Sequence, residues 1–170
     1  MNELAIPNWF LEGDAFYNET HVSEQWRGRI PYFFNGYRAL WAAGKNYSYM
    51  KLRNGSYRDY TPDHYPLGYM LVSYGREKYG DQLWRGVTHD AAAYNSLFYP
   101  FQNAFKQHTG VDFNTFRADA LGYFKKIFND TPDKQHKPDQ HFIADQEYPA
   151  FVDDKTIIYV KTTYKQRPAF

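Results

Sequence analysis

The chain has 170 residues, a formal net charge of +1 and no cysteine. Its length suits one folded domain with a substantial core. The near-zero charge argues against a broad nucleic-acid surface, and the lack of cysteine excludes disulfides, a thiol nucleophile and a cysteine-based zinc site. No apolar stretch approaches the roughly 20 residues of a membrane span.

Three helices are predicted in the first half of the chain, from apolar spacing and from proline or glycine near their ends. They cover residues 8–20, 31–44 and 63–80. The third is apolar on several sides, so we expect it to be central. Residues 46–63 between the second and third are predicted to be irregular, with a turn at Asn54-Gly55.

Three more helices are predicted downstream, over residues 82–94, 100–108 and 113–128. Asp81 can cap the first of these and Asp112 the last, because a carboxylate before a helix accepts a free backbone N–H. The last helix carries an apolar stripe at helical spacing. Its members are Phe113, Phe116, Ala120, Leu121, Phe124 and Ile127.

The composition changes after Asn129, where a polar stretch with two prolines predicts a linker over residues 130–146. Residues 147–170 contain a turn at 153–155 and a run rich in β-branched and aromatic residues, which predicts strands. We therefore expect a mainly α fold: a bundle of about six helices over residues 1–129, with a short β-hairpin tail.

The sharpest functional signal is the segment WFLEGDAFYNE at residues 9–19. On a helix, its Glu12, Phe16 and Glu19 share one face. Carboxylates on one face repel each other unless a cation or a donor lies between them, which points to a metal. A solvated acidic face is the alternative that the spacing leaves open.

This segment resembles the W-x-x-E-G-x-A-x-Y-x-E sequence of gluzincin zinc metallopeptidases, the aminopeptidase-N-like or peptidase MA-like group. The resemblance implies that Glu12 is the third zinc ligand, after the two histidines of HExxH. It also implies that Glu19 supports the site from outside the ligand set.

Two later segments resemble the same family in the same order. Residues 64–75, HYPLGYMLVSYG, are similar to its Y-x-x-G-x-x-x-L helix start, which implies that Tyr65 donates to the tetrahedral intermediate. Residues 105–121 resemble the closing helices of such domains. Without the motif, Tyr65 would be one of 17 tyrosines, packing a helix end.

The HExxH motif itself is missing from this chain. Only 11 residues precede Glu12, none of them His, and no histidine is followed by Glu or belongs to an H-x-x-x-H pair. We therefore expect a fragment that is inactive in isolation and binds no zinc alone. The parent protein would bind zinc through an upstream HExxH segment and act on a peptide or protein substrate.

The tail, EYPAFVDDKTIIYVKTTY, resembles the start of a blade in TolB-like β-propellers, which implies that residues 147–170 open a truncated propeller. Propeller-linked proteins of this kind would suit a bacterial periplasm or cell surface. Two other functions stay open. The chain could be a non-catalytic module that grips peptide or glycan through Trp9, Trp26 and Trp41, or a helical spacer that positions a propeller.

Overall fold

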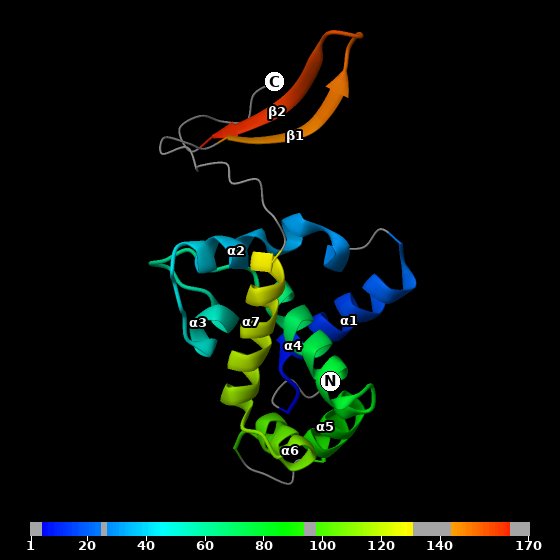
Figure 1. Ribbon diagram of the computed structural model, residues 1–170, viewed down its shortest axis with the longest axis vertical. Coiled ribbons are helices and arrows are strands. Elements are labelled where there is room, and N and C mark those ends of the chain that lie inside the picture. Colours follow the sequence, from blue (N-terminus) through cyan, green and yellow to red (C-terminus); the bar gives the residue numbers. More distant parts are fainter. Residues whose placement is uncertain (1–4, 25–26, 94–97, 131–143, 164–170) are drawn as a thin grey trace. The chain divides into compact units, whose positions relative to one another are not determined.

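Figure 1 shows a computed structural model of the chain, which describes residues 5–24, 27–93, 98–130 and 144–163. The chain divides into two compact units, residues 1–132 and 133–170. Helices make up the first unit and a two-stranded hairpin lies in the second. The predicted mainly α fold with a β-hairpin tail is therefore confirmed.

The described residues of the first unit form seven α-helices and two short 3-10 helices. In chain order these are α1 (Asn8–Val22), η1 (Arg27–Arg29), η2 (Pro31–Phe34), α2 (Asn35–Ala42), α3 (Tyr49–Asn54), α4 (His64–Tyr79), α5 (Leu83–Ala92), α6 (Pro100–Thr109) and α7 (Phe113–Asp130).

The helix α3 lies in the stretch that was predicted to be irregular, so that prediction was wrong in part. Its first turn begins at Ser48, whose hydroxyl accepts a hydrogen bond from the Lys51 amide at 3.3 Å. It ends at Gly55, whose φ of 81° is one that only glycine adopts easily. Six residues are too few to give a visible apolar period, which is why the pattern did not reveal this helix.

The three aspartates that precede α4, α5 and α7 behave differently. Asp63 begins α4 by accepting a hydrogen bond from the backbone N–H of Tyr65 at 3.2 Å. Asp81 does not cap α5, because that helix starts at Leu83 and the Asp81 carboxylate lies 3.8 Å from Nη1 of Arg76 instead. The side chain of Asp112 forms no hydrogen bond or ion pair with any residue that the structure describes.

The core of the first unit is built around α4, which contacts α1, α3, α5 and α7 (Figure 1). Leu67, Met70, Leu71 and Val72 are completely buried on it. The closest approach is between α4 and α1, where Gly68 faces Gly13: a Cβ atom added at Gly68 would lie 3.0 Å from the Cα atom of Gly13. Only a glycine pair allows the two backbones to lie so close.

The apolar stripe of α7 is buried along the first part of the helix and more exposed toward its end. Phe113, Phe116 and Ala120 are buried, whereas Ile127 is 41% exposed, against expectation. The last turns pack instead through Phe128, whose ring lies 4.9 Å from Phe34 and 6.0 Å from Trp41 between centroids.

The hairpin consists of β1 (Ala144–Phe151) and β2 (Ile157–Thr163), paired antiparallel with an irregularity between Glu147 and Ala150. Its predicted turn is confirmed: the Asp153 carboxylate accepts hydrogen bonds from the Lys155 amide at 2.8 Å and the Thr156 hydroxyl at 3.0 Å. β1 starts within the predicted linker, because the backbone of residues 144–146 pairs with β2 although these residues do not have typical strand composition.

Candidate functional site

The residues of the acidic segment lie on α1, as predicted. Phe16 is buried, Glu12 is half-buried and Glu19 is exposed. Neither carboxylate forms a hydrogen bond or an ion pair with another residue in the described part of the chain. Glu19 alone would suit a solvated acidic face, whereas the partly covered Glu12 is available as a ligand.

Tyr65 packs against the face of α1 that carries these carboxylates. Its ring centroid lies 5.3 Å from that of Phe16, which is one helical turn after Glu12 and almost one turn before Glu19. On its other side Tyr65 stacks on His64 at 4.4 Å. The two segments singled out in the sequence, residues 9–19 and 64–75, therefore meet in space through Phe16 and Tyr65.

The glycines of the two segments also meet. Gly13 follows Glu12 in the first segment and Gly68 belongs to the Y-x-x-G of the second, and their backbones are in direct contact. On the far side of α1, Arg76 of α4 donates a hydrogen bond to Asp14 at 2.8 Å, in a partly buried ion pair. These contacts hold α1 and α4 in one fixed relation, and with them Glu12 and Tyr65.

A pocket of about 390 Å³ opens beside Tyr65. Pro66 and Asp63 line it from the start of α4, and Ile30 and Phe33 from the segment before α2. Its walls are mostly apolar, so it can hold an apolar group next to the Tyr65 side chain.

The residues that the structure describes include no group of three His, Cys, Asp or Glu side chains arranged to hold a metal ion. Glu12 can supply one carboxylate oxygen. A zinc site of the His2Glu type would need both histidines from residues other than these.

The three candidate tryptophans fall in different settings. Trp9 is 1% exposed and packs on Phe101 and Phe113 with centroids 5.6 and 5.8 Å away, so it belongs to the core. Trp41 is half-buried between neighbouring rings. Trp26 lies outside the described residues.

One polar cluster was not anticipated from the sequence. The Asp90 carboxylate of α5 accepts hydrogen bonds from Nδ1 of His89 at 3.0 Å and from Nε2 of His108 of α6 at 2.7 Å. These hydrogen bonds lower the pKa of Asp90 below its usual value. The His-Asp neighbours at 89 and 90 were visible in the sequence, but nothing there indicated the partner 18 residues later.

Comparisons with protein-family models, with curated proteins and with solved structures found no match to this chain. Among the helices that the structure describes, none has the length and apolar character needed to cross a membrane.

Proposed function

We propose that this chain is the helical half of a zinc-metallopeptidase-like domain of the HExxH type. In this proposal Glu12 is the third zinc ligand, Glu19 supports it and Tyr65 is the hydroxyl donor. The two histidines and the general base come from an HExxH segment of the same parent protein, upstream of α1.

The observation that carries this proposal is the packing of α1 on α4. Two segments with 44 residues between them in the sequence were singled out by their resemblance to one family, and they touch at Gly13 and Gly68 and again at Phe16 and Tyr65. A carboxylate ligand and an oxyanion donor must be held within a fraction of an ångström to act together. Two rigid helices in backbone contact are a suitable support for that.

The roles of the residues follow from their chemistry. Glu12 is half-buried without a cationic partner among the described residues, so its carboxylate is available to a metal. Tyr65 can donate its phenol hydrogen to an oxygen that becomes negatively charged, which favours the transition state over the substrate. The apolar pocket beside Tyr65 would receive a side chain of the substrate. Zinc, when bound, would supply water acidic enough to attack at neutral pH.

The test uses the chain together with the residues encoded immediately upstream. We expect that segment to contain HExxH, and the longer protein to bind about one zinc and to hydrolyse peptides. Glu12→Gln should lower zinc occupancy, measured by mass spectrometry of the purified protein. Tyr65→Phe should leave zinc in place and lower kcat by roughly 100-fold or more.

Glu24→Gln is the matched control, because Glu24 is an exposed carboxylate beyond the end of α1. An upstream segment without HExxH would refute the proposal. So would zinc occupancy that Glu12→Gln and Glu24→Gln leave equally unchanged, or zinc-dependent peptidase activity in the 170-residue chain alone.

A further inference from the structure

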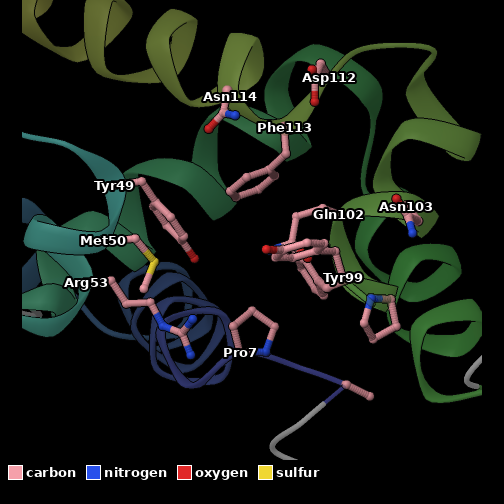
Figure 2. A pocket seen from close by; sticks show the side chains of 13 residues that line it. Pro7, Tyr49, Met50, Arg53, Tyr99, Gln102, Asn103, Asp112, Phe113 and Asn114 are labelled. Carbon is pink, nitrogen blue, oxygen red and sulfur yellow. The ribbon is translucent and has the colours of Figure 1, made fainter. Parts of the chain in front are cut away.

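A second and larger pocket, of about 600 Å³, lies between α3 and the N-terminal ends of α6 and α7 (Figure 2). Neither Glu12 nor Tyr65 lines it. Its volume is in the range of sites that enclose a small organic ligand. It is therefore a separate candidate site, whose chemistry can be derived from its own walls.

The base of the pocket is apolar. Phe101 of α6 and Phe113 of α7 are 2% and 4% exposed, and Pro7 closes the side next to α1. These rings form a surface on which an apolar side chain can pack.

One wall is formed by α3 and carries hydrogen-bond donors. Tyr49 and Arg53 are one turn apart and line the same side of the pocket (Figure 2). The Tyr49 hydroxyl is buried and lies beside the Trp9 side chain. Burial raises the pKa of Tyr49, so the phenol keeps its proton and remains a donor.

Arg53 is exposed and makes no ion pair with a described residue. A guanidinium suits a carboxylate, because its N–H groups donate hydrogen bonds and the opposite charges strengthen them.

The opposite wall carries a negative charge. Asp112, just before α7, lines the pocket away from Arg53 and is exposed. Its carboxylate has no partner among the described residues, although a residue in this position would ordinarily cap its helix. It is therefore free to accept hydrogen bonds from an ammonium group.

The rim of the pocket includes a strained residue. Tyr99 has a φ of 55° and a ψ of 48°, which is unfavourable for a bulky residue and more so before Pro100. The Tyr99 side chain is 71% exposed and lines the pocket. Strain of this kind tends to occur at binding sites.

We propose that this pocket binds a short peptide with free termini. The peptide carboxylate contacts Arg53, the ammonium contacts Asp112, and an apolar side chain packs on Phe101 and Phe113. Unpaired charges of opposite sign on two walls complement a zwitterion, whereas a neutral sugar would leave both charges unpaired. The proposal goes beyond the zinc site and does not depend on it.

The test is isothermal titration of the 170-residue chain with the tripeptide Ala-Phe-Ala, its C-terminal amide and its N-acetyl form. We expect the free tripeptide to bind, and each blocked form to bind about tenfold or more weakly, since each loses a charge-assisted contact. Arg53→Gln should weaken the free tripeptide by a similar factor and leave the amide unchanged. Asp112→Asn should weaken binding of the free tripeptide by a similar factor and leave binding of the N-acetylated form unchanged.

Two exposed residues outside the pocket provide matched controls, Arg58→Gln and Asp154→Asn, which should bind as the unaltered chain does. Thermal unfolding of each variant checks that it is folded. The proposal is overturned if the free tripeptide does not bind, if blocking its ends does not matter, or if maltotriose binds more tightly. Adding Glu12→Gln should not affect any of these results, so failure here and failure of the zinc site are distinguishable.

Discussion

Alanine at Gly68 would force α1 and α4 apart. Its Cβ atom would lie 3.0 Å from Cα of Gly13 and closer still to the carbonyl oxygen of Trp9, whereas ordinary contacts begin at 3.4 Å. Both neighbours are backbone atoms and cannot rotate away, so α1 must move as a whole. That movement loosens the packing of Trp9, Phe10 and Phe16 in the core.

The expected magnitude follows from two opposing effects. Overpacking a well-packed core costs about 1–3 kcal/mol, and a clash with backbone belongs at the upper end of that range. Replacing glycine by alanine inside a helix stabilises the helix by up to about 1 kcal/mol. Gly68→Ala should therefore lower the free energy of unfolding by about 2 kcal/mol, measured by urea unfolding with tryptophan fluorescence.

Gly122→Ala is the matched control, because Gly122 lies inside α7 and a Cβ atom there would meet nothing within 4 Å. It should raise the free energy of unfolding by up to about 1 kcal/mol through helix propensity alone. If Gly68→Ala is as stable as Gly122→Ala, the close approach of the two helices does not exist, and α1 and α4 do not hold Glu12 and Tyr65 in a fixed relation.

Two further perturbations test the helical unit. Hydrogen bonds from His89 and His108 lower the pKa of Asp90 below its ordinary value of 3.8. The ionised carboxylate therefore stabilises the fold fully at pH values above 3.8, and this stabilisation is lost as the pH falls through the lowered pKa. Asp90→Asn should thus reduce the melting temperature more at about pH 5 than at about pH 2.5, and an equal reduction at both would contradict the assignment. Trp84→Phe removes a buried hydrogen bond of 3.0 Å to the carbonyl of Val72 and leaves a gap. It should cost about 2 kcal/mol in urea unfolding, and a neutral result would show that the core closes around the smaller ring.

The long helices and their ends could be predicted from sequence because their signals are local. A run such as α4 shows its apolar residues within a few turns, and Asp63 and Gly80 mark its ends by their own backbone preferences. Short α3 and the exposure of Ile127 could not be predicted in this way. Both depend on which neighbours a segment meets, and a local pattern contains no such information.

The sequence by itself determined the helical class, most helix limits and the two segments that carry Glu12 and Tyr65. Only the tertiary structure decided that these segments touch, that Trp9 lies in the core and that Arg53 and Asp112 line one pocket. The physical reason is that helix formation depends on residues within a turn or two, whereas contacts between helices depend on how distant surfaces fit together.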